Sequence, residues 1–440
     1  MKLAINGGKN IRQNAWPTRF LYNKDKIKET VCNIIDSDNL SGYRGSFGQH
    51  FWGGEYVKAL ETYIEDYYFE RTGKKVKVLA VNSCTSALHI ACGAIDLNYG
   101  QEVIVTPWSM TCSATAPMLY KAKPVFADIE KDFFCLDSES IKEKITPNTK
   151  AIISVDLFGN PHNYEAINKI AKENNLYVIE DCAQALGASF DGLLTGMLGD
   201  IGCFSFTQGK HFTCGEGGLI ITQNEDLYMK CALLRNHVES VINSMPDEVK
   251  FDFCNFENQY GFNMRMTEIQ AAILLEQFKG FSISEFHSNI DLEVDRRKER
   301  VFQLQENINL DFIEWGKVRD NCEHSYYVLP FIFNEKIAGI TRSKFIQALK
   351  AELRIEKTSM GVTEKTDPLI WEGYIKPLYE MPIFCNNYFY TNVSFPIVEE
   401  LQNKSFCFTT FQSLPLDQSD IYDISKAFHK VAQNINELKE

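Results

Sequence analysis

The sequence lacks the features that mark several large classes of protein. No apolar run reaches the roughly 18 residues that a membrane-spanning helix needs, and residues 1–20 lack the apolar stretch of a signal peptide. Basic residues are in deficit, since 45 Lys+Arg stand against 58 Asp+Glu and leave a formal net charge of −13. A general nucleic-acid or membrane-surface binder would show a basic excess instead. We therefore expect neither nucleic acid nor membrane as a partner.

Cysteines are present but lack the spacing of a disulfide framework or a metal site. The chain has 13 of them, scattered, with no CxxC pair and no close Cys/His cluster at zinc spacing. An odd number of cysteines without framework spacing indicates reduced thiols, mostly buried as small apolar groups. The sequence therefore predicts a cytoplasmic protein without a metal site.

Size and composition are those of an ordinary globular protein. The 440 residues are 45% hydrophobic and 23% charged, which excludes intrinsic disorder and collagen-like structure. A chain of this length buries a large core and is expected to form two or three folded units. Composition alone does not select an activity.

Short β-branched runs alternate with helix-compatible stretches in the first two thirds of the chain. The expected strands lie at 75–81, 102–107, 124–129, 151–159, 176–181, 200–206 and 217–222, and expected helices include 85–95 and 163–175. Several runs are apolar throughout, as in strands buried on both faces. The alternation predicts an α/β domain with a mainly parallel sheet flanked by helices. Ligands of such sheets bind at the carboxyl ends of the strands, so polar residues there are the candidates for a site.

A different pattern begins after Thr267, which forms a predicted capping box with Gln270. A long, charged helix that we expect to be exposed follows at 287–308. We then expect a strand at 325–333, a helix at 342–353 and a final helix from about Ser419, while 355–400 resists assignment. These elements predict a smaller C-terminal α+β domain. We place the large domain, with its N-terminal arm, at 1–280 and the small domain at 281–440.

Three polar features follow the predicted strands of the large domain. Ser83, Cys84 and Thr85 begin a helix, where backbone N–H groups can bind a phosphate, although Ser and Thr also serve as plain N-caps. Asp181 ends a buried strand, either as a structural N-cap or as a partner for a protonated ring nitrogen. Lys210 lies in a loop between two buried strands, and enclosure by Phe206 and Phe212 would lower its pKa and make its amine nucleophilic.

A phosphate cradle, an acid and an enclosed amine at strand ends match what pyridoxal phosphate requires. Four motifs then carry a resemblance: NSCTSALH at 82–89, EDCAQALGA at 180–188, SFTQGKHFTCGEGG at 205–218 and YGFNMRMTEIQAAI at 260–273. In this order they resemble the DegT/DnrJ/EryC1/StrS family of pyridoxal-phosphate-dependent sugar aminotransferases, which have the type I fold. The resemblance runs from about residue 35 to the C-terminus.

The resemblance implies a role for each matching residue. Lys210 would hold the cofactor's aldehyde as a Schiff base and move a proton between the substrate and the cofactor. Asp181 would pair with the pyridinium nitrogen, and Gln184 would contact the ring hydroxyl. The phosphate would be held by Cys84, Thr85 and Ser205, and by Asn263 of a second subunit. The family pattern therefore implies a homodimer with shared active sites.

The chain departs from the family pattern at two places. Cys84 stands where glycine is common, so the phosphate turn carries an extra side chain. The family usually stacks an aromatic ring on the cofactor from the loop at 106–112. Trp108 is the candidate for that ring, although simple packing would equally explain it, and Met110 or Thr111 are the alternatives at this position.

His211, His324 and Arg265 are further candidates for contact with the substrate. Some relatives replace the catalytic lysine with histidine and act as deoxysugar dehydratases. Here Lys210 occupies the motif position, so we interpret His211 as a neighbour and favour an aminotransferase. His324 resembles a family position near the substrate and is equally explained as a structural histidine at the start of a strand.

The sequence thus predicts transfer of an amino group from glutamate or glutamine to a keto-sugar, which we expect to be linked to a nucleotide. Such a reaction belongs to the biosynthesis of surface polysaccharides or secondary metabolites. A keto-cyclitol acceptor of the scyllo-inosose type is the main alternative. A dehydratase and a non-catalytic cofactor-binding regulatory protein are the others. Specificity is expected to reside in loops such as 237–259, whose conformation the sequence does not reveal.

Overall fold

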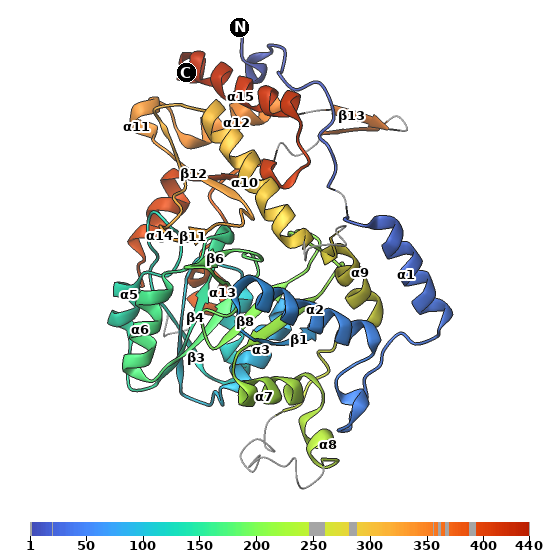
Figure 1. The fold of residues 1–440 in the computed structure, drawn as a ribbon. Helices are drawn as coiled ribbons and strands as arrows, with labels where there is room; N and C mark the ends of the chain where they lie inside the picture. The colour runs from blue at the N-terminus through green and yellow to red at the C-terminus, as the bar shows by residue number, and fades with distance from the viewer. Residues whose placement is uncertain are drawn as a thin grey trace.

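The computed structural model describes residues 2–19, 21–245, 260–280, 288–354, 356–359, 362–365, 369–386 and 393–439. Figure 1 shows a large unit below and a smaller one above it, with the two ends of the chain together in the smaller unit. The described cysteines are free thiols. Among the described helices, none combines the length and the apolar character needed to cross a bilayer.

A seven-stranded sheet forms the centre of the large unit. Its strands are β1 (Lys77–Val81), β2 (Glu102–Val105), β3 (Lys123–Phe126), β4 (Thr149–Val155), β5 (Tyr177–Asp181), β8 (Ile201–Ser205) and β9 (Gly218–Thr222). They lie in the order β1-β9-β8-β5-β4-β2-β3. Only β9 runs antiparallel to its neighbours, β1 and β8. Each of these strands had been expected from the sequence, and the mainly parallel α/β architecture is confirmed.

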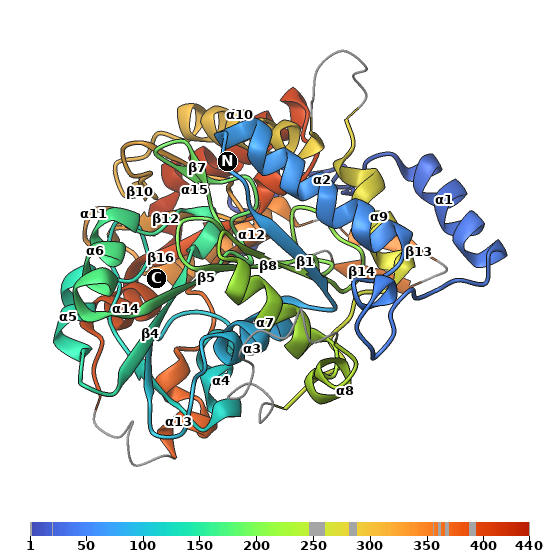
Figure 2. The same ribbon diagram turned by 60° about the horizontal axis from the view of Figure 1, so that its bottom comes forward.

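Helices cover both faces of this sheet, as Figure 2 shows for its β1 side. The helices of the large unit are α1 (Lys24–Asp36), α2 (Glu55–Thr72), α3 (Cys84–Ala94), α4 (Thr111–Thr115), α5 (Ser138–Lys144), α6 (Tyr164–Asn174), α7 (Glu225–Arg235), α8 (Val238–Ile242) and α9 (Glu268–Phe278). On β1, Leu79 and Val81 pack with α3 and α7. The alternate residues Val78 and Ala80 pack with α2 and α9. Burial of both faces explains the continuous apolar runs.

The smaller unit is an antiparallel sheet with helices on it. Its sheet has the order β10-β12-β16-β15, formed by β10 (Ile313–Trp315), β12 (Leu329–Phe333), β15 (Ile370–Glu372) and β16 (Phe406–Thr409). Its helices are α11 (Glu335–Ala338), α12 (Arg342–Leu353) and α15 (Gln418–Gln433). The helices α13 (Pro382–Cys385) and α14 (Pro396–Glu400) pack on the large unit instead, since Phe384 and Val398 are buried in its core. Two further sheets are small: β6 (Ser189–Phe190), β7 (Leu193–Leu194) and β11 (Cys322–Glu323) form one, and β13 (Glu356–Ser359) and β14 (Val362–Lys365) the other.

The N-terminal arm joins the smaller unit, in contrast to its assignment from the sequence. Leu3 and Trp16 are buried in the same core as α12 and α15. Arg12 forms ion pairs with Asp420 at 2.7 Å and Asp423 at 3.0 Å on α15. These contacts link segments more than 400 positions apart, which no local sequence pattern reveals. The expected boundary between residues 280 and 281 borders residues 281–287, which lie outside the described part of the chain.

Helix α10 (Asn289–Asn307) connects the two units and corrects a second expectation. The sequence suggested an exposed helix because so many of its residues are charged. Ile290 belongs to the core of the large unit, whereas Val301 and Leu304 belong to the core of the smaller one. The charged residue Arg297 is itself buried, and its Nε donates to Glu293 at 2.7 Å. One face of α10 is therefore buried although its sequence is strongly polar, because the charges on that face pair with each other.

A buried ion pair fixes the strand that leads into the candidate site. Arg235 on α7 is fully buried and donates to Glu61 on α2 at 2.8 Å and to the Ala80 carbonyl at 3.0 Å. Glu61 also accepts from the Ala80 N–H at 2.8 Å. Both backbone groups of one β1 residue are thus held by the pair, so β1 is locked between α2 and α7.

We predict that Glu61→Ala destabilises the protein by about 3–5 kcal/mol, because it leaves the Arg235 charge buried without compensation. Urea unfolding monitored by circular dichroism measures this difference. The matched control is Glu139→Ala, which breaks the exposed pair with Lys142 and should change stability little. Equal effects of the two substitutions would contradict the role assigned to the buried pair.

Candidate active site

Four segments that are distant in the sequence meet at one edge of the large sheet. They are the turn from β1 into α3, the start of α4 after β2, the end of β5, and the loop after β8. The side chains interlock there: Ser113 Oγ on α4 donates to Asp181 Oδ2 at 2.7 Å, and Cys84 Sγ on α3 lies 3.9 Å from Asp181 Oδ1. The polar residues that the sequence places at the carboxyl ends of the strands therefore lie close together in the structure.

The turn at 82–86 is a true helix start with an outward-facing hydroxyl. Ser83 is the N-cap of α3, and its Oγ accepts from the Ser86 N–H at 3.1 Å. Thr85, on the first turn, is exposed. Gly218 at the start of β9 faces the turn so closely that a Cβ there would lie 2.5 Å from the Ser83 carbonyl carbon. The turn therefore combines the free N–H groups of a helix start with an accessible hydroxyl, which is the chemistry of an anion site.

Asp181 is a buried carboxylate with few hydrogen-bond donors. Besides Ser113, the Ala183 N–H donates to Oδ1 at 3.2 Å. No ion pair to Asp181 is found in the described part of the chain. Burial raises the pKa of Asp181, while Ser113, Ala183 and the charge of Lys210 oppose that rise. A cation placed against this carboxylate would relieve the cost of its burial.

Gln184 is held on both ends of its amide by other parts of the chain. Its Oε1 accepts from the Phe158 N–H at 2.8 Å. Its Nε2 donates to the hydroxyl of Tyr374 at 2.9 Å, from the region that the sequence left unassigned. The side chain is therefore oriented beside Asp181 by two fixed partners.

Lys210 reaches the same edge from the loop after β8. Its Nζ lies 4.5 Å from the centre of the Tyr327 ring, and the backbone N–H donates to the Thr207 carbonyl at 3.0 Å. The expected enclosure by Phe206 and Phe212 differs from what is observed. Both rings turn into the core, where they pack on Phe278, and Lys210 remains partly exposed. The amine is thus accessible.

Ser205 ends β8 and is buried, with its Cα in register with Gly218 of β9. This pairing sets Ser205 beside the turn of Ser83, because a Cβ on Gly218 would touch that turn. Cys84, Thr85 and Ser205 therefore lie on neighbouring elements.

Trp108 is packed in an aromatic core. Its side chain is fully buried and its ring meets Phe406 at 4.8 Å and Phe158 at 5.9 Å, while Nε1 donates to Gln402 at 3.0 Å. These contacts favour the packing interpretation over stacking on a cofactor. Met110 is 52% exposed and serves as the N-cap residue of α4, which Thr111 begins.

The side chain that lies among Thr85, Asp181 and Lys210 is Cys112. Burial, followed by the charge of Asp181, raises the pKa of its thiol to about 11, while a hydrogen bond with Thr85 and the charge of Lys210 act against that rise. Cys112 is therefore a neutral thiol inside the site near pH 7. The sequence reasoning missed it and Ser113, although both follow strand β2 and satisfy the strand-end rule.

Both candidate histidines are buried and neutral. His211 Nε2 donates to the Ser325 carbonyl at 2.9 Å, and burial, aided by the charge of Arg297, lowers its pKa well below the usual value. His324 stacks on Tyr326 at 4.1 Å, and its Nδ1 accepts from the Tyr326 N–H at 2.8 Å. These contacts tie the lysine loop and β11 to neighbouring backbone. They favour the structural interpretation of both residues.

Asn263 and Arg265 lie next to the phosphate turn of the same chain. The Asn82 N–H donates to the Met264 carbonyl at 3.0 Å, and Val81 forms a β-bridge with Arg265. Arg265 Nε donates to Asn263 Oδ1 at 2.8 Å, and Asn263 is exposed. Asn263 therefore stands at the surface beside the site.

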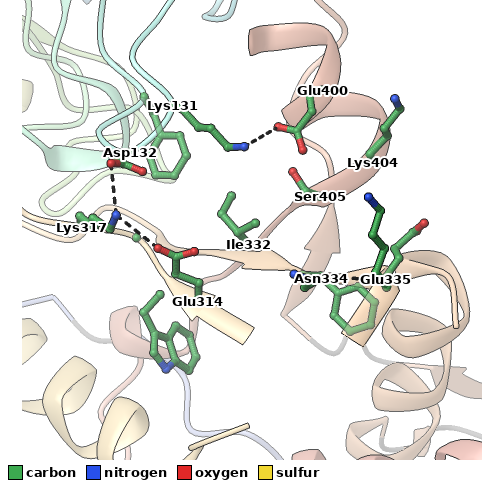
Figure 3. Close-up of a pocket in the computed structure, with 15 residues that line it drawn as sticks. Lys131, Asp132, Glu314, Lys317, Ile332, Asn334, Glu335, Glu400, Lys404 and Ser405 are labelled. Carbon is green, nitrogen blue, oxygen red and sulfur yellow. Dashed lines mark hydrogen bonds and ion pairs between the residues drawn. The ribbon is translucent and has the colours of Figure 1, made fainter. Parts of the chain in front are cut away.

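A separate pocket of about 360 Å³ lies between the two units, and Figure 3 shows its side chains. Lys131 pairs with Glu400 at 3.7 Å across it, and Lys317 pairs with Asp132 at 3.2 Å. None of the predicted site residues lines this pocket. It lies beyond the aromatic core around Trp108, with Phe134 as the shared wall.

A mainly parallel sheet with an amine and a buried carboxylate at its strand ends is the arrangement expected of a transferase of fold type I that uses pyridoxal phosphate. Comparisons with known proteins agree. The model of the DegT/DnrJ/EryC1/StrS aminotransferase family matches residues 46–423. GDP-perosamine synthase of Escherichia coli O157:H7 is 30% identical over 89% of this chain and 92% of its own.

Two further comparisons extend over nearly the whole chain. A putative L-glutamine:3-amino-2,3-dideoxy-scyllo-inosose aminotransferase of Micromonospora echinospora is 27% identical over 100% of this chain and 99% of its own. The aminotransferase from Psychrobacter cryohalolentis has the same fold, with a TM-score of 0.75, 24% identity and coverage of 97% and 100%. The chain belongs to the DegT/DnrJ/EryC1/StrS aminotransferase family, and it is a pyridoxal-phosphate-dependent aminotransferase.

The neutral state of His324 predicts a loss of stability in acid. Burial, followed by the charge of Lys298, lowers its pKa to about 3, whereas the unfolded value is about 6.5, so protons favour the unfolded chain. The stability that neutral His324 contributes is fully present above about pH 6.5 and is lost as the pH falls toward 3. At pH 5 this residue alone lowers the free energy of unfolding by about 2 kcal/mol relative to neutral pH.

Thermal melting at pH 8 and pH 5 measures this loss. We expect His324→Gln to show a smaller drop in Tm between the two pH values than the unmodified protein. The control His50→Gln, at an exposed histidine, should leave the drop unchanged. An unchanged drop in the His324 variant would contradict the prediction.

Proposed function

We propose that this protein transfers an amino group from glutamate or glutamine to a nucleotide-linked keto-sugar. The observation that carries the proposal is the placement of Lys210 and Asp181 around one site that also contains a helix start suited to phosphate. The biosynthesis of a surface polysaccharide or of a secondary metabolite would use such an amino sugar.

The site fits pyridoxal phosphate in three respects. The α3 start and Thr85 offer N–H groups and a hydroxyl for the phosphate. Asp181 offers a buried carboxylate without a cation opposite it in the described part of the chain, and a protonated ring nitrogen would supply that cation. Lys210 offers an accessible amine. When bound, the cofactor supplies an electron sink that stabilises negative charge at the substrate carbon.

The residues of the chain have separate tasks in this proposal. Asp181 holds the proton on the ring nitrogen, because its charge favours the protonated ring. The Lys210 amine takes the proton from the donor's α-carbon and returns one during the second half of the reaction. Thr85, Cys84 and Ser205 bind the phosphate, and Gln184 orients the ring from beside Asp181. Trp108 has no part in holding the ring in this proposal, because its side chain packs on Phe406 and Phe158.

We further propose that two copies of the chain share their sites. Asn263 is exposed beside the phosphate turn, where it can reach a phosphate held by a partner subunit. Arg265 orients Asn263 through the 2.8 Å hydrogen bond to its Oδ1. The cytoplasm is the proposed location, since the described cysteines are free thiols.

A keto-cyclitol is the second candidate acceptor. It is supported by the relative from Micromonospora echinospora, which aligns over 100% of this chain and is named for a scyllo-inosose substrate. The relative from Escherichia coli is named for a GDP-linked sugar and favours the nucleotide-linked alternative. A paired assay with both kinds of ketone, using glutamate and glutamine as donors, separates the two.

Replacement of Lys210 tests the proposed reaction. We expect Lys210→Ala to reduce amino transfer by at least about 10³-fold, since the proton carrier is lost, and to change the visible absorbance of the bound cofactor. The control Gln208→Ala changes an exposed neighbour in the same loop. It should retain the amino transfer and the cofactor absorbance of the unmodified protein. Transfer at the unmodified rate in the Lys210 variant would refute the mechanism, and release of water from a deoxysugar would indicate a dehydratase.

A further inference from the structure

The N-terminal arm passes directly over the lysine loop. Arg19 Nη1 donates to the Gly209 carbonyl at 3.2 Å, and Nη2 donates to the His211 carbonyl at 3.1 Å and to the Lys210 carbonyl. One guanidinium thus binds three consecutive carbonyls, with that of Lys210 at the centre. Hydrogen bonds from a charged donor are stronger than neutral ones, and the planar fork of Arg suits several acceptors at once.

The arm is anchored on both sides of Arg19. Before it, Trp16 is buried against Phe411, with ring centres 5.4 Å apart, in the core of the smaller unit. After it, the Tyr22 hydroxyl donates to Glu293 on α10 at 2.8 Å. Asn23 Nδ2 then donates to the Lys279 carbonyl at 2.8 Å, just beyond α9. Because its flanking residues are fixed, Arg19 is held over the loop.

The loop itself needs such support. It has no regular secondary structure between β8 and β9, and a single turn bond, from the Lys210 N–H to the Thr207 carbonyl, fixes the lysine backbone locally. On the inner side, the loop is held by His211, whose Nε2 donates to the Ser325 carbonyl. Arg19 holds the outer side, so the lysine backbone lies between two tethers.

We propose that Arg19 is a positioning residue for Lys210. This inference rests on the proposed role of Lys210 in amino transfer. Arg19 acts only through the backbone of residues 209–211. Its replacement should therefore loosen the loop without removing any group that carries a proton.

Amide hydrogen exchange in residues 207–213 of the full-length protein, with and without pyridoxal phosphate, tests the tether. We expect Arg19→Met to speed exchange there by about 10-fold or more, and Arg19→Lys by less, since an ammonium cannot reach all three carbonyls at once. The cofactor should also dissociate faster from Arg19→Met, and kcat should fall more than the KM for the amino donor rises.

The matched control is Arg296→Met. Arg296 Nη1 donates to the Tyr22 hydroxyl at 3.0 Å, so it supports the same arm without touching the loop. It should leave exchange in 207–213 within about twofold of the unmodified rate. Equal exchange in the Arg19 and Arg296 variants, with both proteins folded by circular dichroism, would overturn the inference. Faster exchange in Arg19→Met together with no transfer by the unmodified protein would refute the proposed function and leave the tether standing.

Discussion

The carboxylate of Asp181 is buried at the end of β5 without an ion-pair partner in the described part of the chain, and the arrangement of the site depends on this constraint. Burial of a lone charge is costly, and hydrogen bonds from Ser113 and Ala183 offset only part of that cost. A ligand that brings a positive charge would offset the rest of this free-energy cost. In the proposed function, the protonated ring nitrogen of the cofactor supplies this positive charge.

Packed aromatic side chains border the site of Asp181 on one side. Trp108 and Phe158 pack at the junction of the two units, and Tyr374 joins them to Gln184 through its hydroxyl. The amine of Lys210 stands across the site, on a loop held by His211 from within and by Arg19 from outside. Asp181 and Lys210 are thus held in place by different parts of the fold.

The sequence predicted the large sheet and the placement of Lys210 and Asp181 because both rest on local patterns. Apolar runs identify buried strands, and polar residues at their ends identify the site. It did not predict the place of Leu3 and Trp16, since contacts across the whole chain decide it. It misjudged α10 because Glu293 and Arg297 neutralise each other inside the protein. Trp108 resembled a stacking ring in sequence, and only its neighbours, brought together by the fold, reveal it as core.

The protonation state of the cofactor's ring nitrogen is the most direct measure of this account. Nuclear magnetic resonance of the protein loaded with ¹⁵N-labelled pyridoxal phosphate reports it through the chemical shift of that nitrogen. In the unmodified protein we expect this ring nitrogen to stay protonated from about pH 6 to about pH 9, because the carboxylate of Asp181 is close to it. In the Asp181→Asn variant we expect the ring nitrogen to lose its proton. An unprotonated nitrogen in the unmodified protein, or the same shift in both proteins, would contradict the central role of Asp181.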